Sequence, residues 1–218
     1  MLLETKNKLE SAGLIPVLRA SSAKMGHALV DAMMAGGITV IEVTMTVPDA
    51  LTLIRELKQT HGNRILLGSG TVTDAAQAQA TIEAGAEFVV SPSLHLDVIA
   101  RTRDLGKVSI PGALTPTEVI TAWRAGADYV KIFPCSAMGG ASYLKSLLAP
   151  FPDVNLIPTG GVTLQTAADF IKAGARALGV GADLVNAGAI ADGKPELITD
   201  TARAYVEIIQ ATRRPIGA

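Results

Sequence analysis

The sequence predicts an α/β fold of the (β/α)8 TIM barrel class, a closed ring of eight parallel strands each followed by a helix, with an additional N-terminal helix. Its length of 218 residues is one that such barrels reach as a single domain. Hydrophobic residues make up 49% of the chain and charged residues 18%, which favours one extensive core. A small-residue turn followed by an apolar run also recurs four times, as alternating helices and strands require. We therefore expect residues 1–218 to form one domain.

Eight short apolar runs are the expected strands. Four of them follow the repeated turn, whose glycine is typical of the position just past the last turn of a helix. These turns start at Ala35, Ala84, Ala125 and Ala173. The other four runs end in turn residues and alternate with the first set, at residues 14–19, 65–70, 107–111 and 154–159. This alternation indicates a parallel sheet covered by helices, and the repeat spacing of about 41–49 residues favours a closed barrel over a doubly wound open sheet.

Helical patterns separate these runs, and one further helix precedes the first strand. The patterns begin near Ser22, Pro48, Asp74, His95, Pro116, Ala141, Leu164 and Ala191. The start signal is clearest in the fifth of them, where Thr115 can cap the helix, Pro116 takes the first helical position and Glu118 the third.

The composition argues against several classes of function. A net charge of −1, with no block of lysine and arginine, argues against a nucleic-acid partner. No apolar run approaches the roughly 20 residues that cross a bilayer, so we expect a soluble protein without a membrane partner. Cys135 is the only cysteine and the N-terminus lacks a signal-peptide pattern, which together favour the cytoplasm. The three histidines are isolated, so we expect no metal site.

Lys131 is the most informative residue of the chain. It lies inside an apolar stretch, residues 129–134, that otherwise predicts a buried strand. Burial disfavours the ammonium form of a lysine. Such a residue therefore either pairs with a carboxylate or loses its proton and becomes a nucleophilic amine that can form a Schiff base with a carbonyl compound.

Position along the strands separates three charges from the rest. The active site of such a barrel lies at the carboxyl ends of its strands, and only Arg19, Glu42 and Lys131 fall in the middle or later part of a strand. Alternation along the strand places Glu42 and Lys131 opposite the aliphatic faces that suit the helical shell, so both should point to the barrel axis and converge there. The alternative is an internal ion pair that only fixes the core and is weakly stabilising at best.

Glycine-rich loops follow the last two expected strands. Gly160 and Gly161 follow the seventh strand, and Gly181 with Ala182 follows the eighth. Exposed backbone amides in these loops, together with the N-terminus of a short helix after the eighth strand, form the usual phosphate-binding site of barrels. Plain turn chemistry is the alternative explanation for the glycines.

Six segments, taken in chain order, form a specific set. They are Ile41-Glu42-Val43-Thr44, Gly68-Ser69-Gly70-Thr71-Val72, Ser91-Pro92, Pro111-Gly112, Val130-Lys131-Ile132-Phe133-Pro134 and Pro158-Thr159-Gly160-Gly161-Val162. With this set the chain resembles, over most of its length, the class I aldolases of 2-keto-3-deoxy-6-phosphogluconate (KDPG), 2-keto-3-deoxy-6-phosphogalactonate (KDPGal) and 4-hydroxy-2-oxoglutarate. The resemblance implies a Schiff-base role for Lys131 and proton transfer by Glu42, with no cofactor besides the covalent lysine imine. It also implies a homotrimer and a role in the Entner–Doudoroff branch of carbohydrate metabolism.

The resemblance also implies contacts to the pyruvyl part of the substrate. Thr71 and an arginine are expected to contact its carboxylate, and Pro92 and Phe133 to line the pocket. Some relatives place the arginine shortly after the glutamate, where this chain has Thr46. Others place it at the end of the first strand, as Arg19 does here, so Arg19 inherits the role.

The phosphate contacts implied by the resemblance depart from the family pattern at one position. Substrate phosphate is expected at Gly160, Gly161 and Gly181. Many relatives have a serine after the glycines of the eighth strand, where this chain has Ala182, so one hydroxyl donor is missing. An unphosphorylated substrate such as 4-hydroxy-2-oxoglutarate is therefore credible.

These inferences lead us to expect a class I aldolase, a carbon–carbon lyase that reversibly cleaves KDPG to pyruvate and glyceraldehyde 3-phosphate. Cleavage of KDPGal, or of 4-hydroxy-2-oxoglutarate to pyruvate and glyoxylate, stays open, because the sequence determines neither the C4 stereochemistry nor the need for phosphate. A phosphate-binding isomerase or epimerase barrel would share the glycine loops but would not need the inward lysine. A non-catalytic oligomeric scaffold would leave the three mid-strand charges without a role.

Overall fold

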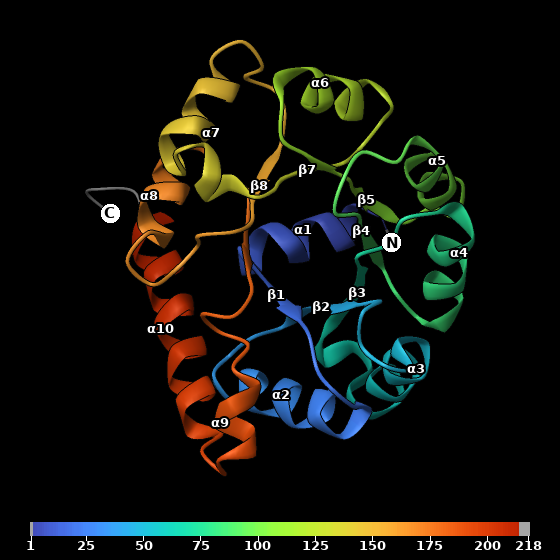
Figure 1. The fold of residues 1–218 in the computed structure, drawn as a ribbon, viewed down its shortest axis with the longest axis vertical. Coiled ribbons are helices and arrows are strands. Elements are labelled where there is room, and N and C mark those ends of the chain that lie inside the picture. Colours follow the sequence, from blue (N-terminus) through green and yellow to red (C-terminus); the bar gives the residue numbers. More distant parts are fainter. Residues whose placement is uncertain (1, 214–218) are drawn as a thin grey trace.

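The computed structural model describes residues 2–213, in which short strands and helices alternate (Figure 1). The strands are β1 (Leu14–Leu18), β2 (Val40–Thr44), β3 (Leu66–Gly70), β4 (Phe88–Val90), β5 (Val108–Ile110), β6 (Gly112–Ala113), β7 (Val130–Ile132), β8 (Leu156–Pro158) and β9 (Leu178–Val180). All of their pairings within the sheets are parallel. The alternation of parallel strands with helices confirms the predicted fold class.

Two sheets join into one ring. The larger sheet has the strand order β5, β4, β3, β2, β1, β9, and the smaller has the order β6, β7, β8. Only Pro111 separates β5 from β6, so these are two halves of the fifth barrel strand. A parallel bridge between Thr159 and Gly179 joins β8 to β9 at the other seam. The carboxyl ends of all the strands therefore meet at one mouth of the barrel.

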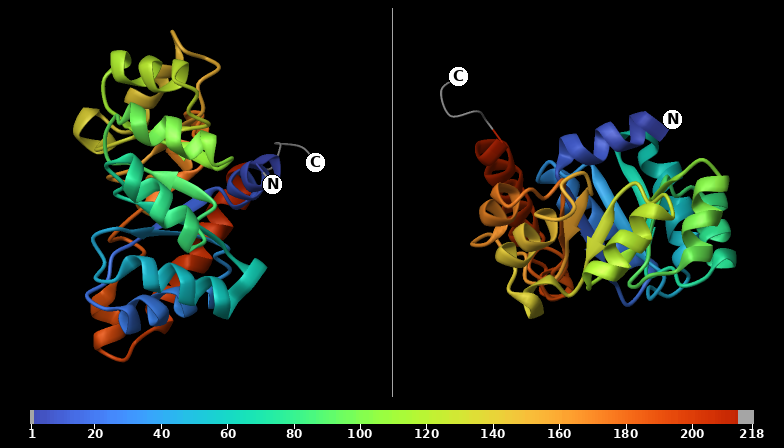
Figure 2. Two further views of the ribbon diagram at one scale, coloured as in Figure 1. Left: turned by 90° about the vertical axis from the view of Figure 1, so that its right-hand side faces the viewer. Right: turned by 90° about the horizontal axis from the view of Figure 1, so that it is seen from above.

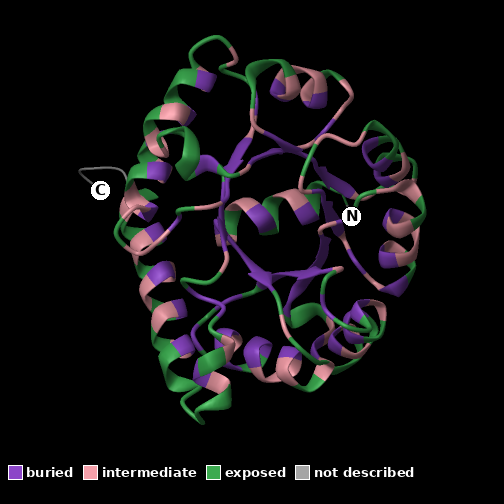
Figure 3. Ribbon diagram, in the orientation of Figure 1, coloured by how far each residue is buried: buried purple, intermediate pink, exposed green. Residues whose placement is uncertain are grey.

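Alternate residues of the strands belong to two separate apolar cores. The inner core fills the barrel and consists of Leu9, Ile15, Val40, Leu66, Phe88, Val90, Val108, Ile110, Tyr129, Ile157 and Ala177. The outer core lies between strands and helices and includes Ile41, Val43, Val130 and Ile132. This separation follows from the two-residue period of a strand. Figure 3 shows the strands buried and the exposed residues on the outer faces of the helices.

The expected N-terminal helix closes one end of the barrel. α1 (Leu2–Ala12) lies across the centre of the ring in Figure 1 and on one end of it in Figure 2. Leu9 is fully buried and packs into the inner core, and Glu10 accepts a hydrogen bond of 2.7 Å from the Tyr129 hydroxyl. Because α1 leads directly into β1, it covers the amino-terminal end of the strands and leaves the carboxyl-terminal mouth open.

The other helices cover the outside of the wall. They are α2 (Ala23–Ala35), α3 (Ala50–His61), α4 (Ala75–Ala84), α5 (Leu96–Asp104), α6 (Pro116–Arg124), α7 (Ala141–Leu148), α8 (Ala167–Lys172), α9 (Ala187–Ala191) and α10 (Glu196–Arg213), with 3-10 turns η1 (Gly62–Arg64) and η2 (Cys135–Met138). Ser22, Asp74 and Thr115 each accept a hydrogen bond from a backbone amide in the first turn of their helix. Glu118 completes a capping box with Thr115, as the sequence predicts. None of the described helices is long and apolar enough to cross a membrane.

The last helical region differs from the expectation. The pattern predicts a helix that begins near Ala191, whereas α9 ends at that residue and a separate helix, α10, begins at Glu196. Gly193 has a φ of 69°, and Pro195 has no backbone N–H to donate, so the segment between the two helices cannot continue a helix. The chain therefore changes direction there before α10 returns along the barrel.

Candidate active site

β2 and β7 carry Glu42 and Lys131 into the barrel interior. Glu42 lies on the same strand face as Val40, and Lys131 lies on the same face as Tyr129, and both of these neighbours belong to the inner core. Glu42 is 3% exposed and Lys131 is 6% exposed. Each charged residue is two positions closer to the carboxyl end of its strand than its apolar neighbour. The two groups therefore lie above the inner core, on the side of the open mouth.

Two glycines of β3 leave the space that this arrangement needs. A Cβ on Gly70 would lie 1.8 Å from Glu42 Oε1, and a Cβ on Gly68 would lie 2.2 Å from the Phe88 ring. Any larger residue at Gly70 would overlap the carboxyl group. This role of the two glycines was not predicted, although alternation along residues 66–70 places both of them on the inner face.

The environment of Glu42 favours a carboxyl that can hold and release a proton. Burial raises the pKa of Glu42 above its ordinary value, and the positive charges of Lys131 and Arg19 oppose that shift. Glu42 Oε1 is buried and has no hydrogen-bond partner among the described residues. A raised proton affinity and an oxygen without a protein partner both suit general acid–base catalysis.

Lys131 Nζ forms no ion pair within residues 2–213. Its neighbour is the ring of Phe133, whose centroid lies 5.2 Å from Nζ. Lys131 and Glu42 are thus close enough for the charge of one to affect the pKa of the other, but they do not form an ion pair. The alternative interpretation, an internal ion pair that only fixes the core, has no support in this geometry.

Arg19, Thr71 and Pro92 follow the ends of β1, β3 and β4 at the open mouth. Arg19 is exposed, and its charge acts on Glu42. Thr71 has a φ of 58°, a left-handed conformation that is uncommon outside glycine and is concentrated at functional sites. Gly112 lies against the backbone of Pro92, because an added Cβ would lie 2.4 Å from the Pro92 carbonyl carbon. These predicted contact residues therefore share one end of the barrel.

Two threonines that sequence analysis assigned no role stabilise this rim. Thr44 Oγ1 donates a hydrogen bond of 2.9 Å to the Leu18 carbonyl and lies 2.8 Å from Thr46 Oγ1. Leu18 immediately precedes Arg19, so Thr44 fixes the end of β1 from which Arg19 extends.

The glycine loops after β8 and β9 are joined by the bridge between Thr159 and Gly179. Gly160 and Gly161 have φ values of 88° and 75°, which favour glycine. Within residues 2–213, the backbone amides of Gly161 and Ala182 donate no backbone hydrogen bond. These loops therefore present unpaired donors, as a backbone anion-binding site requires.

The loop after β9 leads into a short helix, as the sequence predicts. α9 begins only at Ala187, with Asn186 as its cap. Before it, the amides of Leu184 and Val185 both donate to the Gly181 carbonyl, at 3.1 and 2.9 Å, and form a turn. The anion donors of this loop therefore precede α9 in the chain.

Other reactive side chains do not offer a competing centre. Cys135 is buried, with its Sγ 3.6 Å from the Gly140 carbonyl oxygen, and burial raises the pKa of its thiol to about 11. A thiol that stays protonated at neutral pH is a poor nucleophile. In residues 2–213, no three His, Cys, Asp or Glu side chains cluster as metal ligands.

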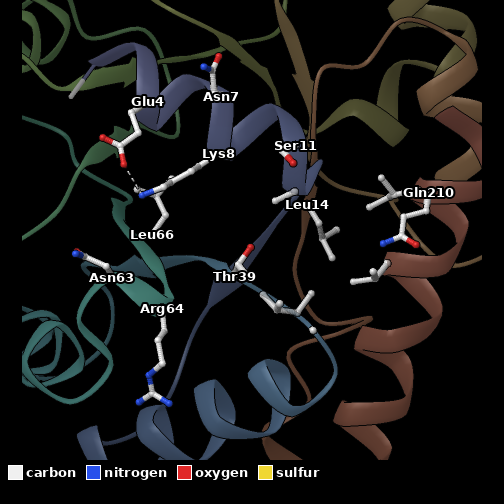
Figure 4. A pocket seen from close by; sticks show the side chains of 15 residues that line it. Glu4, Asn7, Lys8, Ser11, Leu14, Thr39, Asn63, Arg64, Leu66 and Gln210 are labelled. Carbon is white, nitrogen blue, oxygen red and sulfur yellow. Dashed lines mark ion pairs between the residues drawn. The ribbon is translucent and has the colours of Figure 1, made fainter. Parts of the chain in front are cut away.

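A pocket of about 610 Å³ lies at the other end of the barrel, beside α1 (Figure 4). Its lining includes Leu14 and Leu66, which begin their strands, and the ion pair of 2.8 Å between Lys8 and Glu4. None of the predicted substrate-binding residues lines it. This pocket is therefore separate from the candidate active site.

Comparison with known proteins agrees with this geometry. Residues 5–201 match the model of the KDPG and KHG aldolase family. The 2-dehydro-3-deoxy-6-phosphogalactonate aldolase of Escherichia coli (strain K12) is 34% identical over 90% of this chain and 96% of its own. The 2-dehydro-3-deoxy-phosphogluconate aldolase of Pseudomonas aeruginosa is 34% identical over 73% of this chain and 72% of its own.

One similar solved structure contains a reaction intermediate. The KDPG aldolase of Legionella pneumophila, with pyruvate captured at low pH as a covalent carbinolamine intermediate, has a TM-score of 0.85 and 29% identity. The match covers 92% of this chain and 97% of that one. A carbinolamine forms when an amine adds to a carbonyl group, which is the reaction expected of a nucleophilic lysine. The chain belongs to the KDPG and KHG aldolase family and is a carbon–carbon lyase.

Proposed function

We propose that this protein is a class I aldolase that reversibly cleaves KDPG to pyruvate and glyceraldehyde 3-phosphate, with Lys131 as the imine-forming residue. The observation that carries the proposal is the presence of Lys131 and Glu42 together in the barrel interior without an ion pair between them. Membership of an aldolase family, with a relative captured as a pyruvate carbinolamine, supports the same chemistry.

The reaction begins when the neutral amine of Lys131 attacks the C2 carbonyl of the substrate. Glu42 relays protons while the carbinolamine loses water, and the resulting iminium withdraws electrons from the C3–C4 bond. Glu42 then takes the proton of the C4 hydroxyl as that bond breaks and the aldehyde leaves. The enamine that remains is protonated and hydrolysed to pyruvate. The lysine imine serves as the electron sink, so the reaction needs no cofactor.

Arg19 and Thr71 are the proposed contacts of the pyruvyl carboxylate. Arg19 supplies a guanidinium group at the mouth, and Thr71 supplies a hydroxyl and amide from a strained backbone position. Pro92 and Phe133 line the same space. In this role Arg19→Ala raises KM for every 2-keto acid substrate, because all of them share the carboxylate.

Gly160, Gly161, Gly181 and Ala182 are the proposed phosphate site. Ala182 is exposed and has no hydroxyl, whereas the family pattern implies a serine at this position. A hydrogen bond to a charged group is worth about 1.5–3 kcal/mol, or roughly a factor of ten or more in affinity. Ala182 therefore favours 4-hydroxy-2-oxoglutarate as a second candidate substrate, and the resemblance to the Escherichia coli relative favours KDPGal as a third.

Comparing cleavage rates tests the proposal. Pyruvate release is measured with KDPG, KDPGal and 4-hydroxy-2-oxoglutarate, using wild-type protein and Lys131→Met as the control. We expect kcat/KM to be highest for KDPG and activity with all three substrates to be lost in Lys131→Met. If none of the three substrates releases pyruvate, the proposed activity is overturned. If KDPGal or 4-hydroxy-2-oxoglutarate has the highest kcat/KM, that compound replaces KDPG as the proposed substrate.

We further propose that residues 1–218 act as one barrel domain and assemble as a homotrimer in the cytoplasm. The apolar composition of 49% supports buried contact between subunits, and a single cysteine supports a reducing compartment. Sedimentation equilibrium tests the assembly, since a monomer or dimer at micromolar concentration would contradict it.

A further inference from the structure

Tyr205 links the two loops of the proposed phosphate site. This residue of α10 is fully buried. Its hydroxyl lies 2.5 Å from Asp183 Oδ2 and 3.4 Å from the Val162 carbonyl oxygen. Val162 directly follows Gly160-Gly161, and Asp183 directly follows Gly181-Ala182. One buried phenol therefore contacts both glycine loops from behind.

The short contact to Asp183 is the stronger of the two hydrogen bonds. A phenol has one proton to donate, and a carboxylate is a stronger acceptor than a carbonyl oxygen, so the proton goes to Asp183. Burial, followed by the hydrogen bond to Asp183, raises the pKa of Tyr205, so the phenol stays a donor at neutral and alkaline pH. The Asp183 carboxylate is thereby held toward α10.

α10 provides a fixed support for this contact. Thr199, six residues before Tyr205 on α10, donates a hydrogen bond of 2.9 Å to the Ala32 carbonyl of α2. Ala202 is fully buried, and a Cβ added to Gly36 would lie 2.5 Å from its Cβ, so α10 packs tightly against the end of α2. The position of the Tyr205 hydroxyl is therefore set by the helical shell and not by the loops.

An aspartate in this loop is unfavourable for an anion site unless it is restrained. Asp183 is the second residue after Gly181, beside the unpaired amide of Ala182. Aspartate side chains readily accept hydrogen bonds from nearby backbone amides. An unrestrained Asp183 carboxylate would repel a phosphate and could also occupy the amides that the phosphate needs.

We propose that Tyr205 is a positioning residue for the substrate phosphate, because it holds the Asp183 carboxylate away from the glycine loops. The inference rests on the proposed function, in which these loops bind phosphate. It assigns Tyr205 no part in the chemistry at Lys131.

Tyr205→Phe, Asp183→Asn and the double variant test this role. Kinetics are measured with KDPG and with 4-hydroxy-2-oxoglutarate, and inorganic phosphate is tested as a competitive inhibitor. We expect Tyr205→Phe to raise KM for KDPG and the inhibition constant of phosphate about tenfold, because the freed carboxylate competes with phosphate. The kinetic constants for 4-hydroxy-2-oxoglutarate and the kcat for KDPG should stay within about twofold.

The double variant distinguishes charge from structure. Asparagine has no negative charge, so Asp183→Asn in the Tyr205→Phe background should restore KM for KDPG to within about threefold of wild type. If the double variant stays as impaired as Tyr205→Phe, or if Tyr205→Phe leaves KM unchanged, the proposed role is overturned. Tyr129→Phe is the matched control, because it removes a similar buried hydrogen bond, to Glu10, at the opposite end of the barrel.

Two further measurements separate failure of this inference from failure of the proposed function. If wild-type protein binds KDPG no better than 4-hydroxy-2-oxoglutarate and is not inhibited by phosphate, the proposed phosphate site fails and the role of Tyr205 fails with it. If Tyr205→Phe loses its pyruvate adduct, trapped by borohydride at Lys131, the residue acts on the chemistry and the positioning role is overturned. Thermal unfolding of each variant verifies that it is folded.

Discussion

Glu42 and Lys131 are ionisable side chains in a barrel interior that is otherwise apolar. Charged groups in such surroundings are unfavourable unless they are paired, and these two do not form an ion pair within residues 2–213. The stability of the folded state alone therefore does not explain why ionisable residues occupy these two positions. At the residue scale, stability and function therefore oppose each other at these positions.

Glu42→Gln separates the effect of this carboxyl on stability from its effect on activity. Because burial raises the pKa of Glu42, the folded state holds this proton more tightly than the unfolded chain does. The resulting stabilisation is fully present below the ordinary glutamate pKa of about 4.3 and is lost as pH rises through the raised folded-state pKa. The wild-type free energy of unfolding, relative to that of Glu42→Gln, should therefore fall as pH rises, as measured by urea denaturation.

The same substitution should lower kcat by about 10² or more, the usual contribution of a general acid–base group. Formation of the pyruvate adduct at Lys131 should survive, at a slower rate. Full activity in Glu42→Gln would remove Glu42 from the mechanism. If the difference in unfolding free energy between wild type and Glu42→Gln does not change with pH, burial does not raise the pKa of this carboxyl.

Alternation along a strand made it possible to predict the placement of Glu42 and Lys131 from the sequence, because a strand face follows a local rule. The contact between Tyr205 and Asp183 could not be predicted in this way. These residues are 22 positions apart and meet only because α10 packs behind the loop after β9. The sequence offered only a tyrosine on the buried face of a helix and an acidic residue in a glycine loop. Neither feature indicates that the two residues are in contact.

At the scale of single elements, β3 shapes the site through its glycines, whose missing side chains leave space for Glu42. Gly70→Ala would place a Cβ 1.8 Å from Glu42 Oε1, so the carboxyl must move. We expect a loss of about 1–3 kcal/mol in the free energy of unfolding from overpacking. Displacement of a catalytic group by about 1 Å can lower the rate about 10²-fold, so kcat should fall on that scale.

Gly188→Ala serves as the control for this prediction. Gly188 lies in α9, and the nearest atom to an added Cβ is Asn186 Oδ1 at 3.2 Å. The kinetic constants of this variant should match wild type, and its free energy of unfolding should change by no more than about 1 kcal/mol, the usual effect of Gly→Ala in a helix. Wild-type kcat in Gly70→Ala would mean that the barrel relaxes around the new methyl group and that β3 does not constrain Glu42.

The loop after β9 controls the preference for phosphate. Ala182→Ser restores a hydroxyl donor beside the glycine loops, so KM for KDPG should fall about tenfold or more if that hydroxyl reaches the phosphate. Kinetics with 4-hydroxy-2-oxoglutarate, which has no phosphate, provide the control and should not change. An equal effect on both substrates would indicate a general change in the mouth.

Sequence patterns located the elements well and their ends less well. The capping box at Thr115 and Glu118 is a local signal and could be predicted. The last helix was expected to begin near Ala191, whereas α10 begins at Glu196, although Gly193 and Pro195 are visible breakers between the two positions.

At the scale of the whole molecule, the barrel divides stability and chemistry between its two ends. α1 and the inner core close the amino-terminal end with apolar packing, while Glu42, Lys131 and the glycine loops lie toward the carboxyl-terminal mouth. This division is typical of (β/α)8 barrels. Mutations at the closed end should therefore affect folding without affecting the reaction.

Leu9→Ala tests this division. Leu9 is fully buried at the end of the inner core, so its truncation should cost about 2–5 kcal/mol of unfolding free energy. Below the unfolding transition, kcat and KM should stay within about twofold of wild type. A large loss of kcat in a folded Leu9→Ala protein would mean that α1 supports the active site across the barrel.

The most direct test of Lys131 as the imine-forming residue is borohydride reduction in the presence of pyruvate, followed by peptide mass mapping. We expect one stable adduct per chain, on the peptide that contains Lys131, and none in Lys131→Met. An adduct on any other lysine, or wild-type protein that stays unmodified, would contradict the proposed mechanism.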